Sequence, residues 1–175
     1  MSAKLRLIPT ILLAGACVIA LAPMARAAET PTTYQERVVG VETGLPTSCS
    51  NGIGDASSFA GGALGTLNGT FSATICHSTL GSTGGTINQG GSFVLSGQGT
   101  IVGGVFTGGS IVPLPGATGH FGTFCFENFW VMGGLVSTSG YPGSFAAVLT
   151  HYGTWTGTIC NVTFATVAGR ATITA

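Results

Sequence analysis

Two segments of this chain have nearly the same sequence, and both alternate in a way that limits the possible fold. Residues 69–79 read GTFSATICHST, and residues 153–163 read GTWTGTICNVT. In both, Thr, Ser or Cys recurs at every second position, while an aromatic residue and an Ile stand between them. Alternation with a period of two is typical of a β-strand with two unlike faces. We therefore predict that each segment is a short strand with a Thr-rich face and a cysteine.

The rest of the chain also favours strands. Only 6% of the 175 residues are charged and 45% are hydrophobic, which is unlike a disordered chain. The 30 glycines and the many β-branched residues disfavour long amphipathic helices. Further strands are predicted over residues 34–41, 58–64, 92–95, 100–106, 110–114, 120–126, 129–136, 145–152 and 168–174. Breaks rich in Gly, Ser or Pro are predicted at 81–85, 113–119 and 137–143.

The expected fold class is all-β. Frequent turn signals indicate an antiparallel sheet, and Gly103-Gly104 and Gly133-Gly134 lie inside apolar strands where glycine permits bends. We predict a closed or nearly closed β-barrel of about eight to ten short strands, with a two-sheet β-sandwich as the alternative. The pattern is similar in architecture to small secreted calycin-like or allene-oxide-cyclase-like barrels. That resemblance concerns architecture alone and implies no site residue.

The first 27 residues have the features of a secretory signal peptide. Two basic residues precede an apolar run over residues 7–21, and Ala25-Arg26-Ala27 matches the pattern that signal peptidase cleaves. We predict a cleaved signal peptide over residues 1–27 and a single all-β domain over residues 28–175. A retained membrane anchor and a lipid-modified Cys17 are the alternatives.

The predicted mature chain carries little charge. Two arginines stand against five acidic residues, which gives a net charge of −3. Because nucleic acids and anionic membranes are bound by clustered Lys and Arg, we expect no nucleic-acid partner and no membrane-surface patch. We expect a secreted, extracellular or cell-envelope location, with no stable membrane span after cleavage. A membrane-embedded β-barrel is an alternative that the low charge favours, although paired aromatic girdles are missing from the sequence.

Four cysteines remain after the predicted cleavage: Cys49, Cys76, Cys125 and Cys160. An even number of cysteines in an exported chain predicts two disulfides. Of the three possible pairings, the internal similarity favours one bridge in each half, Cys49–Cys76 and Cys125–Cys160. A Cys76–Cys160 bridge between the two similar segments is the main competitor. The sequence contains no Cys-x-x-Cys motif, which argues against thioredoxin-like and zinc-ribbon sites.

The sequence contains none of the common catalytic signatures, so candidates must come from its few ionisable residues. Glu127 stands among aromatic residues, where burial can raise the pKa of a carboxyl group and suit it to acid–base chemistry. His151 is the second candidate. We favour a structural role for Glu127, either on the wet face of a strand or in a hairpin turn. The three histidines and Glu127 show no metal-ligand spacing, so we predict no metal and no cofactor.

Our leading hypothesis is a non-catalytic, secreted, disulfide-stabilised protein of unknown specific role. It would bind a small apolar ligand inside the barrel or an extracellular partner at its loops. Phe71, Phe124, Trp130 and Trp155 are the candidate pocket residues, provided that their rings leave a cavity and do not pack on one another. The alternative is an isomerase- or cyclase-type enzyme, which requires Glu127 or His151 to face an open pocket.

Overall fold

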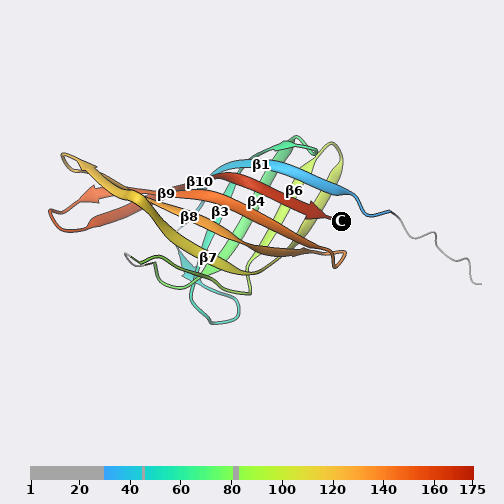
Figure 1. Ribbon diagram of the computed structural model, residues 1–175, viewed down its shortest axis with the longest axis horizontal. Coiled ribbons are helices and arrows are strands. Elements are labelled where there is room, and N and C mark those ends of the chain that lie inside the picture. The colour runs from blue at the N-terminus through green and yellow to red at the C-terminus, as the bar shows by residue number, and fades with distance from the viewer. Residues whose placement is uncertain (1–29, 45, 81–82) are drawn as a thin grey trace, which may run out of the picture. The chain divides into compact units, whose positions relative to one another are not determined.

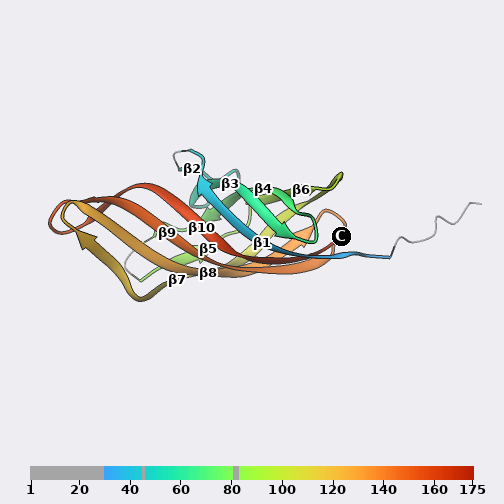
Figure 2. The ribbon, with the colours of Figure 1, turned by 90° about the horizontal axis from the view of Figure 1, so that it is seen from above.

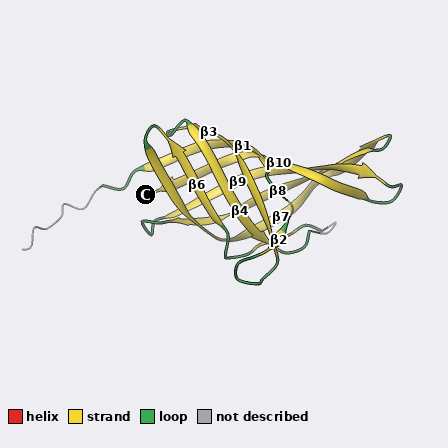
Figure 3. Ribbon diagram, turned by 180° about the vertical axis from the view of Figure 1, so that it is seen from behind, coloured by secondary structure: helices red, strands yellow, loops and turns green. Residues whose placement is uncertain are grey.

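The computed structural model describes residues 30–44, 46–80 and 83–175. The predicted signal peptide, residues 1–27, lies outside the described residues. The compact unit Pro31–Ala175 is built from β-strands (Figure 3). None of the described residues forms a helix, so the described part of the chain offers no helix that could cross a membrane.

The unit contains ten strands in chain order. They are β1 (Thr33–Glu42), β2 (Thr47–Ser48), β3 (Asp55–Gly65), β4 (Gly69–His77), β5 (Gly85–Ile87), β6 (Ser92–Gly97), β7 (Thr100–Phe121), β8 (Phe124–Ser137), β9 (Pro142–Trp155) and β10 (Cys160–Thr174). Glycines with positive φ stand in several of the turns, among them Gly99 between β6 and β7 and Gly140 between β8 and β9. Glycine adopts this backbone conformation without the steric cost that a side chain brings.

Eight of the strands form a closed ring of antiparallel pairs (Figure 1). The ring runs β1, β3, β4, β6, β7, β8, β9 and β10, and β10 then pairs with β1. The short β2 pairs with β3, and the short β5 pairs with both β4 and β7. The predicted all-β, antiparallel fold class is confirmed, and the sheet closes on itself in a barrel-like manner.

The core lies on the inner face of this ring. Alternate residues of each strand are buried there, as the two-residue period requires. Phe106 contacts Phe93 and Phe145 edge to face, with ring centroids 5.8 and 5.1 Å apart. Each fully buried aromatic or aliphatic side chain contributes about 1.5–3 kcal/mol through its removal from water. The inner face is therefore what stabilises the ring.

Glycines make room for the core aromatic rings at particular points. A Cβ atom on Gly40 of β1 would lie 2.6 Å from the Phe71 ring and 2.6 Å from the Ala60 carbonyl oxygen. A Cβ on Gly104 of β7 would lie 2.7 Å from the Phe93 ring. These glycines let an aromatic ring from a nearby strand lie directly against the backbone.

The strands in the second half of the ring are longer than predicted. The strand β7 has 22 residues and runs through the predicted break at 113–119. Its pairing with β8 shifts between Pro113 and Thr118, where a bulge absorbs residues that a proline-containing segment cannot pair regularly, and resumes at Thr118. The predicted strand over 120–126 is also wrong, because a hairpin turn at Gly122, with φ of 59°, divides it.

The two similar segments do not form the same structure. Residues 69–77 form β4, as predicted. In the other segment β9 ends at Trp155 and β10 begins at Cys160, so the predicted strand is a hairpin turn. Gly157, with φ of 97°, stands where the first segment has Ala73. Alanine disfavours that left-handed backbone conformation, so among the five differences between the segments this one favours a turn in the second.

The hairpins β7–β8 and β9–β10 extend beyond the other strands of the ring (Figure 2). The β7–β8 pairing continues to Phe121 and Phe124, and the β9–β10 pairing continues to Trp155 and Cys160. The Trp155 N–H donates a 2.7 Å hydrogen bond to the Thr123 carbonyl, which ties the tip of one hairpin to the other. This extension begins where the core of the ring ends.

Candidate functional site

Five polar side chains gather on the inner face at one end of the ring, which we call the polar end. They are Glu42 at the end of β1, Ser57 near the start of β3, His77 at the end of β4, Glu127 on β8 and His151 on β9. The strand register brings them to one level. On β10, Ala165 pairs with His151 while its neighbour Thr166 pairs with Val41, the residue before Glu42.

The alternation that builds the core also points Glu127 and His151 inward. Glu127 shares its face of β8 with Cys125 and Phe129, which are 0% and 5% exposed. His151 shares its face of β9 with the buried Leu149. Both residues lie on the inward-facing side of their strands, just beyond the apolar core. Glu127 therefore lies within a strand, and the expectation that it stands in a hairpin turn or on the wet face is wrong.

Glu127 and His151 are direct cross-strand partners. The distance between His151 Nδ1 and Glu127 Oε2 is 3.7 Å, and the side chains are 16% and 28% exposed, respectively. The sequence predicted both residues as candidates but did not predict that they meet. Their proximity gives the site an imidazole whose orientation and charge depend on a neighbouring carboxylate.

Burial lowers the pKa of His151 below its ordinary value of 6.5. Loss of hydration disfavours the imidazolium form, and the electrostatic effect of the neighbouring His77 acts in the same direction. The carboxylates of Glu127 and Glu42 raise the pKa of His151 but do not offset the burial. At neutral pH His151 is therefore an uncharged imidazole that can accept a proton.

His77 and Ser57 form a second pair at the polar end. The His77 Nδ1 atom is 2.8 Å from the Ser78 carbonyl oxygen, and the His77 Nε2 atom is 3.1 Å from the Ser57 hydroxyl oxygen. A carbonyl oxygen only accepts hydrogen bonds, so we assign the imidazole proton to Nδ1. The Nε2 lone pair then accepts the hydrogen bond that the Ser57 hydroxyl donates.

Two cavities adjoin these pairs. The first has a volume of about 250 Å³. Its polar lining includes Glu42, Ser57, His77 and His151, and its apolar lining includes Phe59, Ile75, Leu149 and Val167. The second has a volume of about 520 Å³ and is lined in part by Glu127 and His151 together with Phe129 and Trp155. Because His151 lines both, it stands between the two spaces. Glu127 and His151 therefore both border a cavity, as the enzyme hypothesis requires.

The four aromatic pocket candidates lie in different places. Phe71 is buried and lines a small apolar cavity of about 70 Å³ within the core. Trp155 stacks on His120 with ring centroids 4.7 Å apart and lines the 520 Å³ cavity. Trp130 and Phe124 are 37% and 48% exposed. The structure thus does not bring the four rings into one pocket, and they do not pack on one another either.

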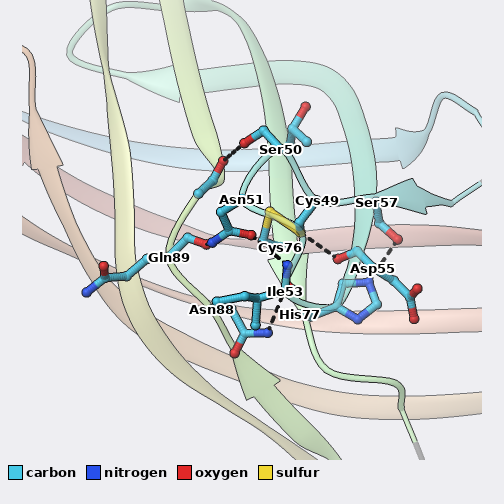
Figure 4. The surroundings of a disulfide bond; sticks show 12 residues. Cys49, Ser50, Asn51, Ile53, Asp55, Ser57, Cys76, His77, Asn88 and Gln89 are labelled. Carbon is cyan, nitrogen blue, oxygen red and sulfur yellow. Dashed lines mark hydrogen bonds between the residues drawn. A yellow bond between two sulfur atoms is a disulfide. The ribbon is translucent and has the colours of Figure 1, made fainter.

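The structure contains two disulfides, Cys49–Cys76 and Cys125–Cys160. This is the pairing within each half that the internal similarity favours. Figure 4 shows that the first bridge fixes the end of β4 beside His77 and Ser57. The second bridge joins the start of β8 to the start of β10, two residues from Glu127. Each disulfide therefore restrains a strand that carries a residue of the polar end.

The loop that follows Cys49 is held in place by side-chain amides. Asn51 accepts a hydrogen bond of 3.0 Å from the Ile53 N–H, and its own amide donates to the Gln89 carbonyl (Figure 4). Asn88 donates to the Ile53 carbonyl. These contacts fasten the loop beside the first disulfide, so the loop and the disulfide together restrain the His77 end of β4.

Among the described residues, no group of three or more His, Cys, Asp or Glu side chains is arranged to hold a metal ion. What the polar end offers instead is hydrogen bonding and proton transfer next to apolar walls. Glu42 and Ser57 were not predicted as site residues. The signal that could have found them is strand alternation, because residues two apart in a strand lie on the same face. Ser57 is two residues from the buried Phe59, and Glu42 ends an alternating strand.

No protein-family model matches this chain, and no significant match was found among curated proteins or solved structures.

Proposed function

We propose that this chain is an exported binding protein that holds a small apolar ligand in the 250 Å³ cavity at the polar end. The observation that carries the proposal is the composition of that cavity, with apolar walls and a few polar groups at one side. Such a combination is typical of sites that bind small molecules, since the walls supply affinity and the polar groups fix orientation. The cavity exceeds the roughly 150 Å³ of engineered apolar cavities that bind benzene.

Export is supported by two independent features. Two disulfides in a small all-β unit are compatible with a stabilised protein of an oxidising, extracellular environment. The N-terminal 27 residues have the basic, apolar and small-x-small order of a cleaved leader. We propose secretion, with residues 28–175 as the mature domain.

The ligand proposal is tested by titrating the mature protein with the neutral dye N-phenyl-1-naphthylamine, whose fluorescence rises in apolar surroundings. Ile75→Trp should abolish the rise because Ile75 lines the cavity and the indole ring would fill it. Ser72→Trp is the matched control, because Ser72 lies on the outer face of the same strand and is exposed. Equal binding by both variants would exclude the cavity as the site, and no binding by the unmodified protein would refute the proposal.

A second candidate function is proton transfer of the isomerase or cyclase type. It is favoured by the 3.7 Å approach of Glu127 to His151 beside a cavity, because an uncharged imidazole oriented by a carboxylate suits a general base. The test is to recover a ligand that copurifies with the protein and to compare it by NMR before and after incubation. An unchanged ligand with the intact protein would rule this candidate out.

A further inference from the structure

The Ser57–His77 pair has the hydrogen-bond directions of an activated serine. The Nδ1–H of His77 is held by the Ser78 carbonyl, and the Nε2 lone pair is 3.1 Å from the Ser57 oxygen. A serine hydroxyl that already donates to an imidazole can transfer its proton to that imidazole as the oxygen attacks. The three parts present are a nucleophile, a base within hydrogen-bond reach and a group that orients the base.

The strands hold this arrangement in place. Ser57 pairs with Ile75 across β3 and β4, and Asp55 pairs with His77, so the serine and the histidine are diagonal neighbours on one face. Diagonal neighbours on adjacent strands are within reach of a long or ring-bearing side chain. Cys76, next to His77, is fixed by its disulfide to Cys49. The pair is therefore built on restrained strands and not on free loops.

The orienting group is a main-chain carbonyl and not a carboxylate. Asp55 is the direct partner of His77, but its carboxylate accepts a hydrogen bond of 3.4 Å from the Thr79 hydroxyl, while the imidazole proton points to Ser78. The carbonyl fixes the tautomer without adding a full negative charge. Without a carboxylate to stabilise the imidazolium, both the attack of Ser57 and the later attack of water are slowed. An activated aryl ester has a better leaving group than the acyl-serine, so we expect acylation followed by slower turnover.

The surroundings suggest what could be attacked. Both members of the pair line the 250 Å³ cavity, where Phe59, Ile75 and Leu149 supply apolar wall. Ser57 itself is only 9% exposed, so it is reached through the cavity and not from the outer surface. A short, uncharged hydrocarbon chain would fit beside it.

We propose that Ser57 is a nucleophile that takes an acyl group from small carboxylic esters with short apolar acyl chains, with His77 as its base. The Ser57 oxygen bonds to the ester carbonyl carbon, and its proton passes to His77 Nε2. The carbon–oxygen bond to the leaving alcohol breaks, and the alcohol leaves with that proton. Water then attacks the acyl-serine by the same route, which releases the carboxylic acid and restores the hydroxyl. This activity goes beyond ligand binding and uses the same cavity.

The experiment mixes the disulfide-intact mature protein with p-nitrophenyl butyrate. We expect a burst of p-nitrophenolate equivalent to one site per molecule, a mass increase of one butyryl group, and peptide mapping that assigns this group to Ser57. Ser57→Ala should abolish the burst, and His77→Gln should slow it by roughly 10²- to 10⁴-fold, the range for loss of a general base. Ser58→Ala, which removes the neighbouring hydroxyl on the opposite face of β3, should acylate like the unmodified protein.

The mapping on the unmodified protein decides the matter even if a variant fails to fold. An absent burst, or a butyryl group on a residue other than Ser57, would overturn the assignment. If the dye still binds while the ester fails to react, the ligand-binding proposal stands and the assignment of Ser57 as a nucleophile is refuted. If acylation of Ser57 occurs while the dye does not bind, the ligand-binding proposal fails and the assignment of Ser57 as a nucleophile stands.

Discussion

At the scale of single residues, the polar end brings four ionisable groups and one hydroxyl together in a chain with few charges. His151 is the group most affected, because burial lowers its pKa while two carboxylates oppose that effect. A group whose pKa is lower in the folded protein than in the unfolded chain makes stability depend on pH.

A first prediction concerns acid stability. Below the unfolded pKa of 6.5, the unfolded chain binds a proton at this position that the folded protein takes up only at lower pH. Stability is therefore unaffected by His151 well above pH 6.5 and falls as the pH drops through that value. We expect the free energy of unfolding in urea to decrease less for His151→Gln than for the unmodified protein between pH 7.5 and pH 5. Equal decreases would show that another group controls acid stability.

A second prediction concerns the carboxylate next to the imidazole. Glu127 raises the pKa of His151 through its charge and a hydrogen bond, so Glu127→Gln should lower that pKa further. An NMR titration of the His151 ring protons measures the effect. Asp55→Asn is the matched control, because it removes a carboxylate from the same end of the ring that is not a cause of the His151 shift. A rise in the pKa of His151 in Glu127→Gln would contradict the pairing.

The sequence identified Glu127 and His151 through the scarcity of ionisable residues, but it could not pair them. Pairing depends on the register of β8 against β9, which the turn between Ser137 and Pro142 sets, and a shift of one residue would have turned one of them outward. Ser57 escaped notice because serine is common in this chain. What marks Ser57 is its 3.1 Å hydrogen bond to His77 beside a cavity, which becomes visible in the structure alone.

At the scale of strands, close contact between backbone and aromatic rings determines which glycines matter. Gly40 and Gly61 face each other across β1 and β3, and Phe71 lies against the first of them. Added atoms in such a packed contact force the ring or the strand to shift, which destabilises the fold. Glycines over open space lack this constraint.

This difference gives a paired prediction. Gly40→Ala should lower the free energy of unfolding by about 1–3 kcal/mol, because its Cβ would lie 2.6 Å from both the Phe71 ring and a carbonyl oxygen. Gly62→Ala on β3 is the control, since a Cβ there meets nothing within 4 Å. Urea denaturation of the two variants measures the effect. Equal stability of both would mean that the ring tolerates the added methyl group by moving.

Strand identity was largely predictable from alternation, whereas strand ends were not. The prediction for β4 was correct, but the similar segment at 153–163 contains a turn between β9 and β10, in which Gly157 has a positive φ where the first segment has Ala73. Likewise, the Pro- and Gly-rich segment at 113–119 reads as a loop but is a bulge inside β7, since its neighbour β8 continues to pair on both sides of it. In each case tertiary pairing decided what the local sequence left open.

At the scale of the whole unit, the two disulfides restrain the end of the ring at which the polar residues lie. They enclose segments of similar length, with separations of 27 and 35 residues. The entropy that a bridge removes from the unfolded chain grows only with the logarithm of the loop length. The closure of the ring was predictable from glycines inside strands and from strand number, but the extended hairpins were not, since no pattern marks where a core ends.

We expect Cys49→Ala/Cys76→Ala and Cys125→Ala/Cys160→Ala each to lower the free energy of unfolding by about 2–4 kcal/mol. On chain entropy alone the two losses should differ by only about 0.2 kcal/mol. Chemical denaturation of both double variants, with thiols blocked, measures this. A much larger loss for one pair would show that its bridge acts through native contacts and not through the unfolded chain.

The pairing of β1 with β10 has a consequence for how this chain avoids aggregation. A sheet with free edges presents unpaired amide and carbonyl groups on which other chains can stack into fibrils, and a Thr- and Gly-rich polypeptide with few charged residues has little charge to repel them. The pairing of the first strand, β1, with the last strand, β10, leaves no free edge around the ring. Opening the ring at this pairing would expose two strand edges and favour amyloid-like assembly.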